Sequence, residues 1–159
     1  AAQVATQIGA VNAFAYDLQA ACSGFLYGMS TASSMIASGR YKKILLIGAD
    51  KMSSIVDYDD RATCIIFGDG AGAALFEASD SGFGWEDEYL RSDGSGRKFL
   101  NIRAGGSLHP TSADTVRNKM HNLYQDGKTV FKYAVSEMSN ATEQIIQRNS
   151  IDTKNLKYL

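Results

Sequence analysis

The chain has 159 residues, of which 45% are hydrophobic and 21% are charged, and its formal net charge is −1. This composition predicts a folded domain with a core of its own and excludes the basic charge excess that nucleic-acid binders usually carry. The longest apolar runs, such as residues 44–47, are far too short to cross a bilayer. We therefore expect neither a nucleic acid nor a membrane as a partner.

The two cysteines, Cys22 and Cys64, are the only candidates for a disulfide. Each lies among small or apolar residues, which favours two free thiols in a reducing compartment and therefore a cytoplasmic location. The sequence has no Cys-x-x-Cys pair, and its histidines, His109 and His121, are far apart along the chain. We therefore expect no metal site.

The first fifty residues are expected to contain a helix, a strand, a second helix and a second strand. Their predicted bounds are 1–8, 11–18, 22–38 and 41–50. Gly9 and Gly39 mark the two helix ends, because glycine is common just after a helix. Gly24 and Gly28 indicate that another backbone approaches the second helix closely, since glycine otherwise weakens a helix. The apolar run 44–47 predicts a strand covered on both faces, joined to the first strand by a right-handed crossover.

The next segment is expected to form a polar loop followed by a hairpin. The hairpin would consist of a buried strand, a glycine-rich turn and a partner strand, at residues 63–67, 68–72 and 73–78. The turn lacks the spacing of a dinucleotide-binding loop. The acidic stretch 57–60 lacks the ligand spacing of a calcium loop, so we interpret it as a solvated turn with Arg61 as its charge partner.

The second half begins with a shift in composition at Ser79, after which turn-forming residues are frequent. Two exposed strands are predicted, at 85–90 and 99–103. Residues 104–121 are expected to be an irregular surface loop or a cap over a site. Residues 127–149 carry an apolar stripe of helical period and predict the longest helix, with the stripe facing a core. Residues 151–159 would lead into another strand.

The two ends of the sequence predict an internal piece of a longer protein. The chain begins at Ala1 without a methionine, and residues 156–159 read as the start of an apolar strand. The absence of a signal peptide then carries no information about targeting.

Cys22 stands where the turn after the first predicted strand meets the second predicted helix. A thiol at a helix N-terminus faces unpaired backbone N–H groups and the positive end of the helix dipole, and both favour the thiolate. Cys22 is therefore a candidate nucleophile. Alternatively, it is a small apolar filler, because free cysteine is among the most buried residue types. The local pattern favours neither interpretation over the other.

Four further segments carry a more specific signal. They are residues 17–25 (DLQAACSGF), 47–50 (IGAD), 60–72 (DRATCIIFGDGAG) and 127–132 (GKTVFK). Their order and spacing resemble the β-ketoacyl-acyl carrier protein synthase III family, and the resemblance runs over the whole chain. The cysteine segment together with the glycine-rich segment is a specific pair, and it shifts the interpretation of Cys22 towards the nucleophile.

The resemblance implies an α/β, thiolase-like fold. In this family the layers run helix–sheet–helix–sheet–helix with mixed five-stranded sheets, and here they would be incomplete. Residues 1–80 would be the later part of the N-terminal thiolase-like half and would carry the nucleophile. Residues 81–159 would be the opening part of the C-terminal half.

The resemblance also implies the reaction that initiates fatty-acid synthesis. This is a decarboxylating Claisen condensation of an acyl-CoA primer, typically acetyl-CoA, with malonyl-acyl carrier protein. Cys22 would hold the acyl group, with its own backbone N–H as one oxyanion donor. The coenzyme A thioester would be a substrate, with no tightly bound cofactor, and the enzyme would be a homodimer.

Further site residues are implied only by the same resemblance. Arg61 would contact the adenine end of coenzyme A, while Ile66 and Phe67 would lie near the acyl pocket. Gly127 and Phe131 would lie along the pantetheine channel. The next residue after them, Lys132, would suit docking of an acidic carrier protein.

The sequence departs from the family at the other two catalytic groups, a histidine in a His-Gln-Ala-Asn-type motif and a later asparagine. Neither His109 nor His121 matches that motif, and residues 156–159 resemble only its lead-in. We therefore expect these 159 residues alone to be inactive in condensation. Two alternatives stay open: another thiolase-fold acyltransferase of quinolone or polyketide type, and a non-catalytic thiolase-fold protein that binds an acyl carrier, with Cys22 inert.

Overall fold

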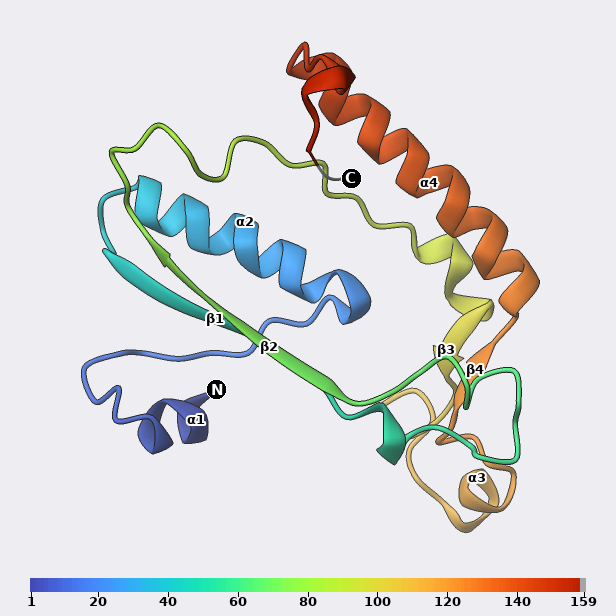
Figure 1. Cartoon of the computed structure of the whole chain (residues 1–159). Helices are drawn as coiled ribbons and strands as arrows, with labels where there is room; N and C mark the ends of the chain where they lie inside the picture. The colour runs from blue at the N-terminus through green and yellow to red at the C-terminus, as the bar shows by residue number, and fades with distance from the viewer. Residues whose placement is uncertain (158–159) are drawn as a thin grey trace. The chain divides into compact units, whose positions relative to one another are not determined.

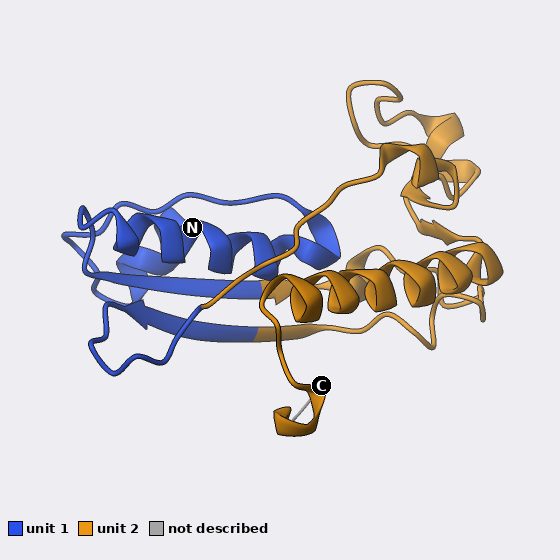
Figure 2. Ribbon diagram, turned by 90° about the horizontal axis from the view of Figure 1, so that it is seen from above, with its two compact units in different colours: residues 1–48, 72–85 blue, residues 49–71, 86–159 orange. Residues whose placement is uncertain are grey.

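The structure is a computed structural model that describes residues 1–157, and it divides into two compact units. Unit 1 comprises Ala1–Gly48 and Gly72–Trp85. Unit 2 comprises Ala49–Ala71 and the chain from Glu86 onward, and Figure 2 colours the two units separately.

Unit 1 is built around one helix on a two-stranded sheet. Its elements are α1 (Ala2–Gln7), the 3-10 turn η1 (Ala21–Ser23), α2 (Gly24–Ala37) and most of the strands β1 (Lys43–Asp50) and β2 (Gly70–Glu77). The last two residues of β1 and the first two of β2 belong to unit 2. Lys43 at the start of β1 forms an ion pair with Glu77 at the end of β2, 3.1 Å between Nζ and Oε2, so the two strands run antiparallel. Figure 1 shows α2 lying along one face of this sheet.

Two glycines allow α2 and β1 to pack closely. A Cβ atom added to Gly28 of α2 would collide with the Leu46 side chain of β1. Conversely, a Cβ on Gly48 of β1 would lie 2.9 Å from Cδ2 of Phe25 in α2. A close contact is therefore present at Gly28, but the Leu46 side chain makes it and not the predicted backbone, and Gly24 has open space around it.

Unit 2 combines a short ladder with the longest helix. Its elements are η2 (Met52–Ser54), η3 (Gly94–Lys98), β3 (Leu100–Ile102), α3 (Ala113–Arg117), β4 (Leu123–Gln125), α4 (Gly127–Arg148) and η4 (Thr153–Asn155). β3 and β4 pair antiparallel, with Leu100 opposite Gln125. Asp126 caps α4 by accepting from the Thr129 N–H at 3.2 Å. Within residues 1–157, no helix is both long and apolar enough to cross a bilayer.

The predicted helices and the most apolar strand are confirmed with small shifts of their ends. The helices expected at 1–8, 22–38 and 127–149 correspond to α1, α2 and α4, and β1 lies within 41–50. Gly9 and Gly39 follow the ends of α1 and α2 with φ of +74° and +72°, the left-handed region that glycine adopts without steric cost. β3 lies within the strand predicted at 99–103.

The prediction of a strand at 11–18 is wrong. The right-handed crossover predicted from this strand to β1 is therefore wrong as well. Among the described residues, no neighbouring strand pairs with this segment. It runs without regular secondary structure and contacts the residues just before β1, with the ring centroids of Phe14 and Tyr41 5.4 Å apart. Alternating apolar side chains form a strand only where another backbone supplies hydrogen bonds.

The hairpin predicted at 63–78 is also wrong. Residues 61–66 form consecutive turns, in which the N–H groups of Thr63 and Cys64 donate to the Asp60 carbonyl at 3.2 and 3.0 Å. Those N–H groups are therefore not available to a strand partner. β2 begins at Gly70, inside the predicted glycine turn, and pairs with β1 instead.

Two predictions for the second half need correction as well. Residues 85–90 are not a strand, because side chains hold this segment in place: the Arg148 guanidinium donates to both carboxylate oxygens of Asp87, at 2.7 and 2.8 Å. The stretch 104–121 is not irregular throughout, since it contains α3, which Ser112 begins with a capping box. The connection expected at 151–159 contains η4, and its last two residues lie outside the described ones.

Large apolar faces stay uncovered among the described residues. The burial of β1 alternates, so that Leu45 and Ile47 are exposed, and the prediction of a strand covered on both faces is wrong. The apolar stripe of α4 is only partly covered: none of its residues is buried, and Phe131 and Met138 are each 70% accessible. Proteins this size usually bury such stripes against a core.

The contact of α2 with β1 gives a matched pair of substitutions. We expect Gly28→Ala to lower the free energy of unfolding by about 1–2 kcal/mol, because the overpacking against Leu46 exceeds the gain in helix propensity. Gly24→Ala should be neutral or slightly stabilising, since nothing lies within 4 Å of its added Cβ. Urea unfolding of both variants measures the difference, and equal stabilities would contradict the close packing.

Candidate active site

Cys22 lies in the 3-10 turn η1 that leads directly into α2, and its thiol is free and exposed. The exposure does not fit the alternative of a buried apolar filler. The residue before it, Ala21, has φ of +46°, a left-handed conformation that non-glycine residues rarely adopt. The backbone is therefore locally strained at the point that presents the thiol.

The start of α2 leaves its positive end without a neutralising side chain. The N-cap, Ser23, makes no side-chain capping hydrogen bond, and the first turn of α2 contains no acidic residue. The partial charge of the helix N-terminus next to Cys22 is thus available to stabilise a negative charge. This arrangement suits a cysteine that reacts as a nucleophile.

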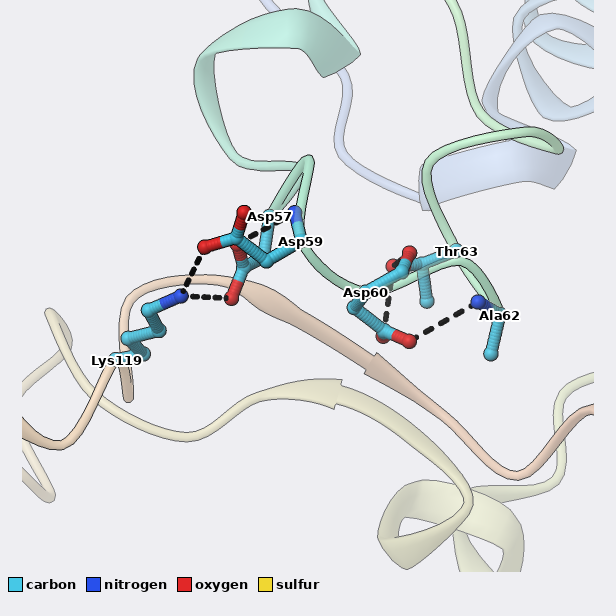
Figure 3. Close-up of polar contacts among 6 residues, drawn as sticks. All are labelled: Asp57, Asp59, Asp60, Ala62, Thr63 and Lys119. Carbon is cyan, nitrogen blue, oxygen red and sulfur yellow. Dashed lines mark hydrogen bonds and ion pairs between the residues drawn. The ribbon is translucent and has the colours of Figure 1, made fainter.

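Arg61 projects from a turn that Asp60 organises. The Asp60 carboxylate accepts from the Ala62 N–H at 3.0 Å and from the Thr63 hydroxyl at 2.9 Å (Figure 3), and Thr63 has no exposed surface. The Arg61 side chain is exposed, and the described part of the chain gives it no acidic partner within ion-pair distance.

The charge partner of the acidic stretch is Lys119, so the prediction that Arg61 fills this role is wrong. Its Nζ lies 2.8 Å from Oδ2 of Asp57 and 3.0 Å from Oδ2 of Asp59. The hydrogen bond from Lys119, helped by the Asp59 N–H, lowers the pKa of Asp57 below its usual value, and the two carboxylates raise the pKa of Lys119. Local sequence reasoning missed this pair because the partners are about sixty residues apart.

The glycine-rich segment after Arg61 is tied back through Asp69. Its carboxylate accepts from the N–H and the hydroxyl of Ser53, both at 2.7 Å. These two hydrogen bonds lower the pKa of Asp69 below its usual value. The aspartate between Gly68 and Gly70 thus joins the start of β2 to η2, a role that the spacing of the glycines does not predict.

The other candidate residues fall into two groups within unit 2. Ile66 is exposed and Phe67 half-buried, both at the end of the turns that carry Arg61. Gly127, Phe131 and Lys132 occupy the first two turns of α4, and all three are exposed. Cys22 belongs to unit 1.

The two histidines have structural surroundings in unit 2. Nε2 of His121 lies 3.0 Å from Oγ1 of Thr115, the hydroxyl that also takes part in the capping of α3. The His109 carbonyl accepts from the N–H of Gly105 at 2.9 Å. These contacts assign both residues to the packing of segment 104–121.

Comparison with known proteins gives consistent matches to one family. The family model described as 3-oxoacyl-(acyl-carrier-protein) synthase III matches residues 16–94. The beta-ketoacyl-(acyl-carrier-protein) synthase III of Phocaeicola vulgatus is 58% identical over 153 residues, which is 96% of this chain and 46% of the relative. The chain therefore spans about half the length of the curated relatives it matches.

Solved structures give the same result. The synthase III from Thermus thermophilus superposes with a TM-score of 0.83 at 34% identity, over 98% of this chain and 47% of that one. The priming β-ketosynthase from the R1128 polyketide biosynthetic pathway superposes with a TM-score of 0.70 at 32% identity, over 88% and 41% of the two chains.

These neighbours and the mixed helix-and-sheet architecture define an α/β fold of the thiolase-like class, with incomplete sheets in this chain. Within that class, the chain matches the 3-oxoacyl-(acyl-carrier-protein) synthase III family.

The strained residue before Cys22 can be tested with two substitutions. Ala21→Val should lower the free energy of unfolding by about 1–2 kcal/mol and change the rate at which the Cys22 thiol is labelled, because a β-branched residue fits poorly at positive φ. Ala21→Gly should keep or slightly raise stability, since glycine adopts this conformation freely. Thermal unfolding and the rate of thiol labelling measure the two effects, and a tolerated valine would contradict the strained geometry.

Proposed function

We propose that this chain is part of a longer condensing enzyme that initiates fatty-acid synthesis, and that Cys22 is its acyl-accepting nucleophile. The observation that carries the proposal is an exposed thiol presented by a strained backbone at the start of α2, in a chain that matches this family. The exposed apolar residues of β1 and α4 support a larger folded protein around it.

The proposed reaction has two covalent steps. In the first, the Cys22 thiolate attacks the thioester carbonyl of an acyl-CoA primer, a new S–C bond forms, and coenzyme A leaves as its thiolate. The backbone N–H of Cys22 donates to the oxyanion of the tetrahedral intermediate. In the second, malonyl-acyl carrier protein loses carbon dioxide, and the resulting carbanion attacks the acyl group. A C–C bond then forms, and the S–C bond to Cys22 breaks.

The remaining catalytic groups of the family, a histidine and an asparagine, match no residue of this chain. We propose that other parts of the full-length enzyme supply them, and that these 159 residues do not catalyse condensation alone. Residues 1–80 would then belong to the N-terminal thiolase-like half and residues 81–159 to the C-terminal half. The full-length enzyme would be a cytoplasmic homodimer without a tightly bound cofactor.

We assign the substrate contacts to exposed and half-buried residues of unit 2. Arg61 would stack its planar guanidinium on the adenine of coenzyme A, since that group suits flat aromatic faces. Ile66 and Phe67 would border the acyl pocket. Gly127 and Phe131 would line the pantetheine channel, and the next residue along α4, Lys132, would attract the acidic carrier protein.

A second candidate function is supported by one of the solved structures. Because a polyketide priming β-ketosynthase matches most of this chain at 32% identity, a primer other than acetyl-CoA is compatible with the same nucleophile. Turnover with a series of acyl-CoA primers distinguishes the two functions. A non-catalytic carrier-binding protein is the outcome if no primer acylates the protein.

The nucleophile can be identified by labelling. Incubation of the full-length protein with radiolabelled acetyl-CoA should place the acetyl group on Cys22, located by peptide mass. Cys22→Ser should abolish the label, whereas Cys64→Ser, the matched control at the second free cysteine, should retain it. A label on Cys64, or none with any primer, would contradict the acyl-enzyme.

The coenzyme A assignment can be tested at Arg61. Arg61→Ala in the full-length enzyme should raise the KM for acyl-CoA about tenfold, because a cation–π contact is lost, and should leave the KM for malonyl-acyl carrier protein nearly unchanged. Arg117→Ala is a control, since Arg117 pairs with Asp114 within α3. Equal effects on both substrates would remove the assignment.

A further inference from the structure

Lys119 connects two parts of unit 2 that are distant in sequence. Its ammonium group binds Asp57 and Asp59, the residues that immediately precede the turn carrying Arg61 (Figure 3). The Asp57 side chain is only 20% exposed, and its Oδ1 also accepts the Asp59 N–H at 3.1 Å. One ammonium therefore fixes both carboxylates relative to each other.

The backbone at Lys119 has an unusual conformation for a lysine. Lys119 has φ of +51°, and it follows Asn118, the C-cap of α3. A left-handed residue at this place is common after a helix, but glycine or asparagine usually occupies it. A lysine tolerates it poorly, so the position retains a long cationic side chain where the backbone alone would favour a small residue.

The other side of the link is equally well anchored. The loop before the acidic stretch is held by the Leu123 N–H, which donates to the Ile55 carbonyl at 2.8 Å, and Val56 is almost fully buried. On the far side, Asp60 and the fully buried Thr63 hold the turn after Arg61. Between these two anchors lie the exposed residues Tyr58 and Asp59, which neither anchor holds. Lys119 restrains this stretch through its bonds to Asp57 and Asp59.

From this geometry we propose that Lys119 is a positioning residue for Arg61: by binding Asp57 and Asp59, it holds the turn in the conformation from which Arg61 reaches the nucleotide end of an acyl-CoA. The inference rests on the proposed contact of Arg61 with coenzyme A. Lys119 itself touches no substrate. Lys119 raises the fraction of molecules in which the Arg61 turn has the binding geometry, and this raises the affinity for acyl-CoA.

The test uses the full-length enzyme and the variants Lys119→Asn and Lys119→Arg. Asparagine accepts the left-handed backbone but removes the ammonium, so the fold is kept while the link is lost. We expect the KM for acyl-CoA to rise about two- to fivefold, with kcat and the KM for malonyl-acyl carrier protein unchanged. Arginine keeps the charge and should restore most of the affinity.

A second variant removes the same link from its other end. Asp57→Asn/Asp59→Asn leaves Lys119 in place and should raise the KM for acyl-CoA to the same extent. Arg117→Gln breaks an exposed ion pair of similar length within α3, 3.1 Å from Asp114, and should change nothing. If neither removal of the link changes the KM for acyl-CoA, the positioning role is wrong.

Combining Lys119→Asn with Arg61→Ala separates this inference from the proposed function. If Lys119 acts through Arg61, the double variant should have the KM of Arg61→Ala alone. Additive effects would overturn the positioning role while leaving the coenzyme A contact intact. If Arg61→Ala alone leaves the KM for acyl-CoA unchanged, the proposed contact fails first, and an effect of Lys119→Asn must then have another cause.

Discussion

Unit 2 depends on the attachment of β4 to the loop that begins at Ile55. The Leu123 N–H at the start of β4 donates to the Ile55 carbonyl, and the same three-residue strand pairs with β3. The chain then enters α4 directly after Asp126. One short strand thus connects the turn of Arg61 with the first turns of α4, so backbone hydrogen bonds set the spacing of two groups of proposed contact residues.

The division between supporting and contact residues follows from that arrangement. Thr63 and Val56 are buried, while Arg61 and Phe131 are exposed and contribute little to packing. Exposed side chains on a fixed backbone can be specialised for a ligand without loss of stability. Cys22 follows the same pattern in unit 1, because α2 packs on β1 through residues one turn or more beyond the thiol.

The elements predicted correctly are those whose sequence pattern lies within the element and needs no partner elsewhere in the chain. α2, β1 and α4 each carry a long periodic or apolar run, and the position of Cys22 at the start of α2 followed from it. The failures share one cause. Residues 11–18 and 63–67 have the composition of strands, but strand formation requires a partner backbone, and the Asp60 carbonyl binds the N–H groups of Thr63 and Cys64 instead. The ion pair of Lys119 with Asp57 joins residues that are distant in sequence, so no local pattern predicts it.

The packing of α2 on β1 is reciprocal. Gly28 of the helix packs against Leu46 of the strand, and Gly48 of the strand packs against Phe25 of the helix. A larger residue at either glycine needs a smaller residue opposite, because a well-packed interior tolerates changes only when its total volume is kept. We therefore expect substitutions at these four positions to be coupled in two pairs, so that the helix presenting Cys22 changes only together with the strand beneath it.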